Sequence, residues 1–184
     1  MNSEGFRYDV NEWTAGNVLA RQAHSLGSKT FVHLVDGGTL SYAEADSMAN
    51  RVANALRSLS VGKGDRVAVL LPNGLEICHL WLGAARIGAV HVAVNTQYRG
   101  VFLSHVMASY GATVAVCHGD YLARLVEIAE DLPALRTVIV VGDAPGIERA
   151  NPHFELLGFE EILPADDRPV ETRVSYHSKG AADR

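Results

Sequence analysis

The sequence predicts an α/β protein with a layered parallel sheet, flanking helices and an N-terminal β-hairpin. Two observations carry this prediction. Short apolar runs alternate with segments of helical periodicity, and glycines follow most of those helical segments. The alternation gives four strands separated by three helices, which make three consecutive βαβ units with right-handed crossovers.

The N-terminal segment predicts a helix followed by a hairpin. The helix spans residues 14–26 and can be capped by Thr14. Its expected buried face consists of Val18, Leu19, Ala23 and Leu26. Residues 30–35 and 39–40 are β-prone, and residues 36–38 (Asp-Gly-Gly) supply the turn between them.

A capping box begins the second helix. Ser41 can accept from a first-turn N–H, while Glu44 reaches back to the cap. The apolar residues behind it recur at helical spacing: Ala45, Met48, Ala49, Val52, Leu56 and Leu59. Gly62 and Gly64 are expected to end this helix. Residues 62–65 (Gly-Lys-Gly-Asp) follow a helix and not a strand, so they predict a turn and not a phosphate loop.

The rest of the chain repeats strand and helix. The predicted strands are Arg66–Leu71, Ala89–Val94, Thr113–Cys117 and Thr137–Val141. The predicted helices are Leu75–Ile87, Gly100–Tyr110, a helix from Tyr121 to about Glu130 capped by Asp120, and a short helix from Phe154 to Leu163. Residues 1–163 therefore form one N-terminal subdomain, and residues 164–184 predict a polar linker and a disordered tail.

Composition excludes several classes of function. The 184 residues carry a net charge of −5 without a basic stripe, which argues against nucleic acid as a partner. No apolar run approaches the roughly 18 residues of a membrane-spanning helix, and the first residues do not resemble a signal peptide, so a cytoplasmic protein is expected. Cys78 and Cys117 form no metal or dithiol motif and predict free thiols.

Polar residues leave the carboxyl ends of two predicted strands. One group lies in residues 95–99, and Arg124 lies in residues 120–124, after the next strand. The candidate binding residues are Asn95, Thr96, Gln97, Arg99 and Arg124. Open α/β sheets bind ligands at such ends, although ordinary connections have the same appearance. His79 and His91 have no second ligand nearby and predict packed structural residues.

Five sequence blocks, at residues 39–46, 49–56, 64–73, 85–95 and 109–116, resemble the opening of the AMP-forming adenylate enzymes. That superfamily includes acyl-CoA synthetases, luciferases and the adenylation domains of peptide synthetases. Residues 94–100 (Val-Asn-Thr-Gln-Tyr-Arg-Gly) are most similar to small-acid and carnitine-type CoA ligases. One departure is Ala93, where most members have Pro.

The resemblance implies the fold and chemistry of a larger parent enzyme. The parent would activate a carboxylic acid with ATP as an acyl-adenylate, with release of pyrophosphate, and pass the acyl group to coenzyme A. ATP, Mg²⁺ and coenzyme A are therefore the expected cofactors of the parent. Asn95, Thr96, Gln97, Arg99 and Arg124 would edge its CoA tunnel.

The 184 residues contain no T-S-G-T-T-G-type phosphate loop. The chain is thus expected to be an incomplete N-terminal part of the adenylate-forming fold. It is expected to be inactive alone, to bind no cofactor by itself, and to have no catalytic or metal-binding residue. Such a part should self-associate through exposed apolar surface. Two alternatives stay open: a non-enzymatic α/β remnant or partner-binding module, and the start of a peptide-synthetase adenylation domain.

Overall fold

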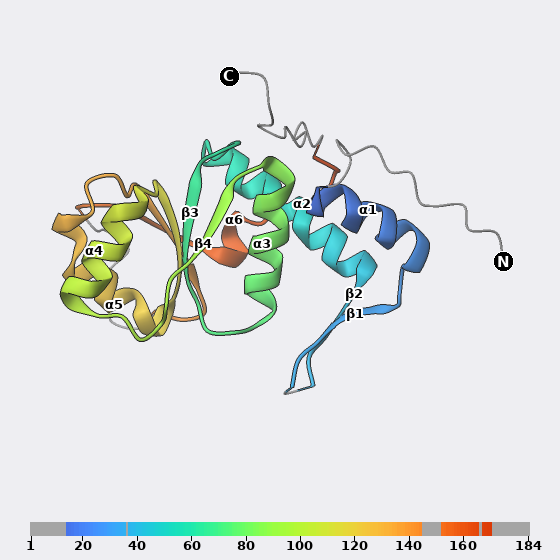
Figure 1. The fold of residues 1–184 in the computed structure, drawn as a ribbon, viewed down its shortest axis with the longest axis horizontal. Helices are drawn as coiled ribbons and strands as arrows, with labels where there is room; N and C mark the ends of the chain where they lie inside the picture. Colours follow the sequence, from blue (N-terminus) through green and yellow to red (C-terminus); the bar gives the residue numbers. More distant parts are fainter. Residues whose placement is uncertain (1–13, 36, 145–151, 166, 171–184) are drawn as a thin grey trace, which may run out of the picture.

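The computed structural model describes residues 14–35, 37–144, 152–165 and 167–170. Its centre is a five-stranded parallel sheet in the order β4-β3-β5-β6-β7 (Figure 1). The strands are β3 (Arg66–Leu70), β4 (Val90–Ala93), β5 (Val114–His118), β6 (Thr137–Val141) and β7 (Glu155–Gly158). All four strands predicted from the sequence are present and parallel.

The fifth strand, β7, corrects the prediction of a single helix from Phe154 to Leu163. Residues 155–158 pair with β6, and the amide of Glu155 donates to the carbonyl of Arg136 at 2.8 Å. Only α6 (Phe159–Ile162) is helical. Pairing with a neighbouring strand outweighs local helical propensity in this segment, and periodicity cannot separate the two over so few residues.

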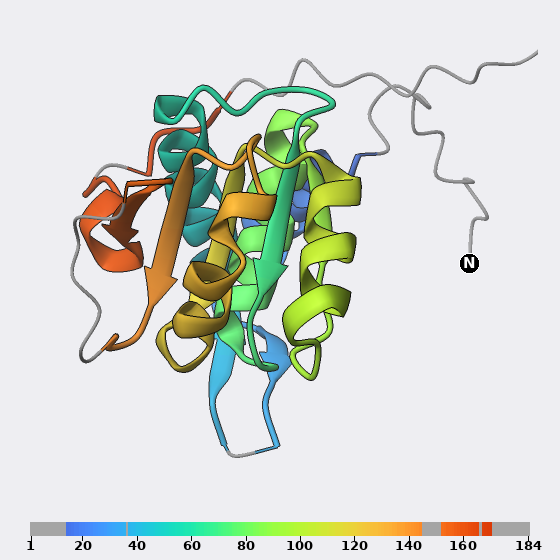
Figure 2. The same cartoon turned by 90° about the vertical axis from the view of Figure 1, so that its left-hand side faces the viewer.

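Helices cover both faces of the sheet, as Figure 2 shows. One face carries α2 (Tyr42–Ser58), α3 (Leu75–Ile87) and α6, and the other carries α4 (Gly100–Tyr110) and α5 (Gly119–Glu127). Strand β3 is buried from both sides, because Val67 and Val69 face the first layer while Ala68 and Leu70 face the second. This explains its nearly continuous apolar sequence.

An N-terminal unit packs on the outside of this layer. It consists of α1 (Ala15–Leu26) and the antiparallel hairpin of β1 (Thr30–His33) and β2 (Thr39–Ser41), which projects away from the main sheet (Figure 1). The hairpin, the Thr14 cap and the capping box of Ser41 and Glu44 confirm the predictions. The predicted buried face of α1 was wrong at Val18, which is 42% exposed.

Three helix ends differ from the predicted ones. Helix α2 ends at Ser58 with Ser60 in the left-handed region (φ 63°), so Gly62 and Gly64 belong to the turn that follows. Helix α5 is capped by His118, whose side chain accepts from the amide of Asp120 at 3.3 Å. A 3₁₀ turn (Ala129–Asp131) follows α5, which itself ends at Glu127.

Helices α1, α2 and α3 meet around two glycines and one ion pair. A Cβ on Gly83 of α3 would lie 2.5 Å from Val52 of α2, so only a glycine permits this approach. A Cβ on Gly16 of α1 would lie 3.0 Å from Arg86. The Arg86 guanidinium is buried and pairs with Asp46 of α2. The close backbone approach therefore encloses a charged pair.

The segment after α6 returns to α2. Arg51 donates to the carbonyl of Pro164 at 2.7 Å, Ser47 donates to Asp167 at 2.7 Å, and Val170 is buried in the core under α2. The described part of the expected linker is thus attached to the subdomain, and the expected tail lies outside the described residues. Among the described residues, no helix is long and apolar enough to cross a membrane.

Candidate functional site

The site is the edge of the sheet where parallel strands end. The chain passes from β3 through α3 to β4, which lies on one side of β3. It then passes through α4 to β5, which lies on the other side of β3. The order in which strands are added to the sheet therefore reverses at β3. In open α/β sheets the loops at such a reversal form a crevice that binds ligands.

Arg124 lies in helix α5 and not in a loop, and it contacts the loop that follows β4. Its Nη1 donates to the backbone carbonyl of Thr96 at 2.7 Å, although the residues are 28 positions apart. The guanidinium also lies over the Tyr121 ring, 4.5 Å from its centroid, in cation–π geometry. The structure thus brings Arg124 against the loop after β4. The bond to Thr96 uses one of five guanidinium donors.

The loop after β4 is fixed by its own polar side chains. The Asn95 carboxamide oxygen accepts from the amide of Gln97 at 2.8 Å, which is an Asx turn. The Arg99 Nη1 donates to the carbonyl of Gln97 at 2.8 Å. Asn95, Gln97 and Arg99 are exposed, whereas Thr96 is half-buried. The five predicted residues thus form one polar, cationic edge.

Cys117 lies directly under this edge and does not supply a nucleophile. It is fully buried at the end of β5. Burial raises the pKa of the Cys117 thiol to about 12, and the charge of Arg124 opposes this only in part. Because the thiolate is the reactive form of cysteine, Cys117 is inert at neutral pH. The free thiols predicted from the sequence are present at both Cys78 and Cys117.

A cavity of about 370 Å³ opens at the carboxyl ends of β3 and β4. Its polar lining comes from Asn73, His91, Asn95 and Thr96, over an apolar floor that includes Val69 and Leu71. Burial lowers the pKa of His91, and its Nε2 atom is buried without a hydrogen-bond partner among the described residues. His91 thus lines this cavity, whereas the sequence predicted a packed structural residue.

Asn73 and His91 were not identified as site residues from the sequence. The loop that carries Asn73 comes a full helix before residues 95–99 in the chain. Only the pairing of β3 with β4 places the two loops side by side. The Asn73-Gly74 turn directly after a buried strand was the available signal.

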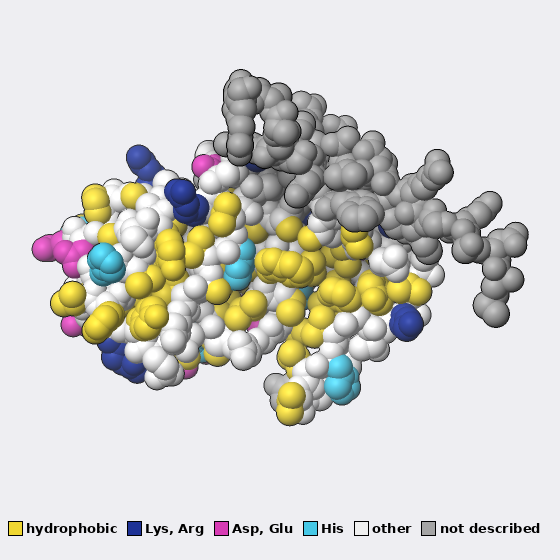
Figure 3. Space-filling model, in the orientation of Figure 1, with side chains coloured by type: hydrophobic (Ala, Val, Ile, Leu, Met, Phe, Trp, Pro, Cys, Tyr) yellow, Lys and Arg dark blue, Asp and Glu magenta, His cyan; other side chains and the backbone are white. Residues whose placement is uncertain are grey.

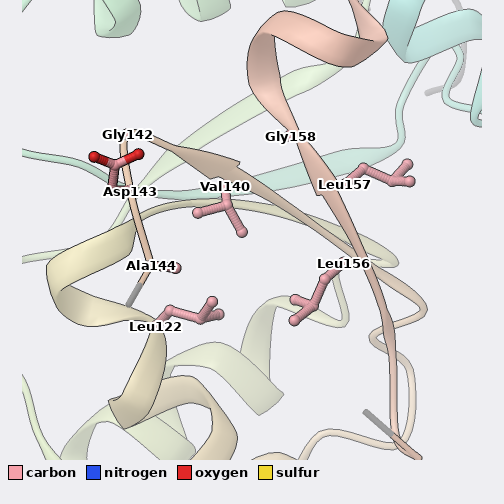
Figure 4. A pocket seen from close by; sticks show the side chains of 8 residues that line it. All are labelled: Leu122, Val140, Gly142, Asp143, Ala144, Leu156, Leu157 and Gly158. Atoms are coloured by element: carbon pink, nitrogen blue, oxygen red, sulfur yellow. The ribbon is translucent and has the colours of Figure 1, made fainter. Parts of the chain in front are cut away.

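A second cavity, of about 240 Å³, lies between α5, β6 and β7. Figure 4 shows Leu122, Val140 and Leu156 pointing towards the same space, with Asp143 at its edge. The lining is mostly aliphatic and carries one carboxylate. It therefore lacks the cationic character of the edge around Arg124.

The geometry of this edge indicates a class of ligand-binding protein. An open parallel sheet with a cationic, polar loop edge at its carboxyl ends is typical of α/β proteins that bind anionic small molecules. Within the described ranges, no group of three or more His, Cys, Asp and Glu side chains is arranged to hold a metal ion.

Comparison with known proteins gives the family. Residues 19–172 match the family model described as AMP-binding enzyme, and the chain belongs to this family. It is 36% identical over 107 residues to the long-chain-fatty-acid–CoA ligase FadD13 of Mycobacterium tuberculosis, covering 58% of this chain and 19% of that protein. It is 43% identical over 114 residues to a salicyl-AMP ligase/salicyl-S-ArCP synthetase of the same organism, covering 59% and 20%.

The fold comparison agrees. A solved fatty acyl CoA synthetase of Mycobacterium tuberculosis matches with a TM-score of 0.66 and 26% identity, over 80% of this chain and 33% of that one. The chain thus spans about a fifth of the length of the curated relatives. The resemblance to adenylate-forming enzymes and the fold class predicted from the sequence are both confirmed.

Proposed function

We propose that this chain is the N-terminal subdomain of an ATP-dependent acid–CoA ligase that activates a carboxylic acid as an acyl-adenylate and transfers it to coenzyme A. The observation that carries the proposal is the family match over residues 19–172, together with a relative that is a CoA ligase. The parent would use ATP, Mg²⁺ and CoA in the cytoplasm, and the carnitine-type subgroup is the proposed branch. The proposed subdomain is residues 1–163, and Pro164, Asp167 and Val170 of the expected linker pack back against its helix α2.

The activation step needs groups that these residues do not supply. Adenylate formation requires donors for the ATP phosphates and a metal ion that neutralises the charge of the transition state. The sequence contains no glycine-rich loop between a strand and a helix. The purified 184-residue chain is therefore expected to show no carboxylate-dependent exchange of pyrophosphate into ATP.

The exchange assay should use a panel of aliphatic and aromatic acids, with a complete ligase of the family as positive control. A longer polypeptide that continues this chain into the rest of the ligase fold should show the exchange. Acid-dependent exchange by the 184-residue chain itself would contradict the proposal of an inactive part. Absence of exchange in the longer polypeptide would favour the non-enzymatic alternative.

The cationic edge is the proposed border of the CoA site. Arg124 is anchored by Thr96 and Tyr121, so its position is fixed before a ligand arrives. A guanidinium binds phosphate oxygens through forked hydrogen bonds. In the complete ligase, Arg124→Ala is expected to raise the KM for CoA about tenfold, equivalent to about 1.4 kcal/mol, and to leave the rate of acyl-adenylate formation unchanged.

Two variants sharpen this test. Arg124→Lys keeps the charge and should recover part of the affinity for CoA. Arg136→Ala removes an exposed cation at the opposite, amino-terminal end of β6 and should change neither step. An equal loss of adenylate formation in Arg124→Ala would show that Arg124 supports the fold and not the CoA site.

A second candidate function is adenylation with transfer to a carrier protein. The salicyl-AMP ligase/salicyl-S-ArCP synthetase relative favours it, because that protein's name includes a carrier-protein product. Both functions share adenylate formation and differ in the acceptor thiol. Thioester formation by the complete enzyme with CoA, but not with a phosphopantetheinylated carrier protein, would support the CoA ligase.

A further inference from the structure

The outer edge of β4 is open among the residues that the structure describes. Within these ranges strand β4 ends the order of the sheet and pairs only with β3. On the inner side, the amide of Val90 donates to Asp65 at 2.7 Å and the amide of Val94 donates to Val69 at 2.9 Å. Because successive amides of a strand point in opposite directions, the N–H and C=O groups of His91 and Ala93 point outward.

The surface on both sides of this edge is apolar. Trp81 of α3 is 50% exposed, Val90 of β4 is 46% exposed, and Phe102 of α4 is 75% exposed. Figure 3 shows hydrophobic side chains across the middle of the face that carries α4, β4 and α3, with the charged side chains mostly at its margins. An exposed apolar patch with an open strand is the usual signature of an interaction surface.

The edge also lacks the features that normally keep sheets apart. Neither β4 nor α4 contains Asp, Glu, Lys or Arg. Burial lowers the pKa of His91, so this strand is uncharged at neutral pH. Ala93 is exposed and keeps its outward N–H group, which a proline would remove. At the opposite end of the sheet, β7 places the charged Glu155 on its strand.

We propose that a second copy of this chain pairs with the outer edge of β4 in antiparallel orientation, about a two-fold axis through Val92. In this register His91 of each copy lies opposite Ala93 of the other copy. Each of these two His91–Ala93 pairs forms two backbone hydrogen bonds. The two five-stranded sheets then form one continuous sheet, and Trp81 and Phe102 pack against the other copy.

A second copy is the favoured occupant because the surface is complementary to itself. Identical antiparallel strands satisfy each other's outward amides and carbonyls, and a two-fold interface places the same patch on both sides. The patch has no charge that would oppose its own copy or select a charged partner. This inference is independent of the proposed ligase activity.

Analytical ultracentrifugation of the purified chain, from low micromolar to several hundred micromolar, tests the proposal. The wild type is expected to be a dimer that dissociates on dilution. Ala93→Pro removes an outward donor and no bond to β3, so it is expected to raise the dimer dissociation constant about tenfold or more with an unchanged thermal melt. Pro is also the residue that most members of the resembled superfamily carry here.

A second variant and a second measurement keep the test decisive. Val90→Lys adds a charge at an exposed edge position and should weaken the dimer in the same way, without removing an amide. Hydrogen exchange should show concentration-dependent protection of the amides of His91 and Ala93 in the wild type. A monomer at every concentration would overturn the proposal. This includes a monomer in which another part of the chain already protects the amides of His91 and Ala93. So would a dimer that neither substitution weakens.

Discussion

Gly119→Ala is expected to lower the free energy of unfolding by more than about 3 kcal/mol, a large fraction of the total stability of a domain. A Cβ at this position would lie 1.8 Å from the carbonyl oxygen of Asp143 and 2.6 Å from its carbonyl carbon. These are backbone atoms, so no side-chain rotation removes the clash. The loops after β5 and β6 would have to separate. Urea unfolding followed by circular dichroism measures the loss.

Gly62→Ala is the matched control. A Cβ on Gly62 would meet nothing closer than the Asp65 carboxylate at 3.8 Å, and its backbone lies outside the left-handed region. The amide of Gly62 keeps its 2.8 Å bond to that carboxylate. This variant should change stability by no more than about 0.5 kcal/mol. Equal stability of the Gly119→Ala and Gly62→Ala proteins would show that the close approach of the two loops is not required.

Asp46→Ala is expected to destabilise the protein by about 3–5 kcal/mol. Arg86 is buried among α1, α2 and α3, with a side-chain exposure of 4%, and Asp46 is its carboxylate partner. Removing that partner leaves a buried guanidinium without compensation, which costs more than the pair itself contributes. The measurement is again the midpoint of urea unfolding. A lower midpoint with an unchanged slope against urea concentration reports a loss of stability.

The double substitution Asp46→Ala with Arg86→Met separates charge from packing. Methionine keeps an aliphatic stem beside Gly16 and removes the buried charge. The double variant should therefore be more stable than Asp46→Ala alone. If it is less stable, the contribution of Arg86 comes from its shape and contacts and not from its ion pair.

Local signals were sufficient for most of the fold. The capping box at Ser41, the left-handed glycines after α3 and α4, and the apolar run from Arg66 each act within a few residues, so sequence positions alone indicated these elements. Strand β7 was missed because four residues are too short for periodicity, and because its strand character depends on pairing with β6. The end of α2 at Ser58 was missed because the left-handed residue that follows it, Ser60, is not a glycine and has no reliable local signal.

The candidate site was predicted only in part, because some of its residues come together only through the strand order. The rule that ligands bind after parallel strands selected the loop at Asn95 and the segment with Arg124, and the structure brings them together through Thr96. The rule does not give strand order, so it could not place Asn73 beside Asn95 or show that His91 belongs to an outer strand. Those facts depend on tertiary pairing.

The strand order also has a consequence for synthesis on the ribosome. β3 is the first strand of the sheet to be made, and it has the central position between β4 and β5. Every later strand joins at an edge that is still open, since β4 adds on one side and β5, β6 and β7 add successively on the other. None of the five strands that the structure describes has to insert between two strands that are already paired. The nascent chain can therefore build its sheet outward in the order of translation, without breaking contacts formed earlier.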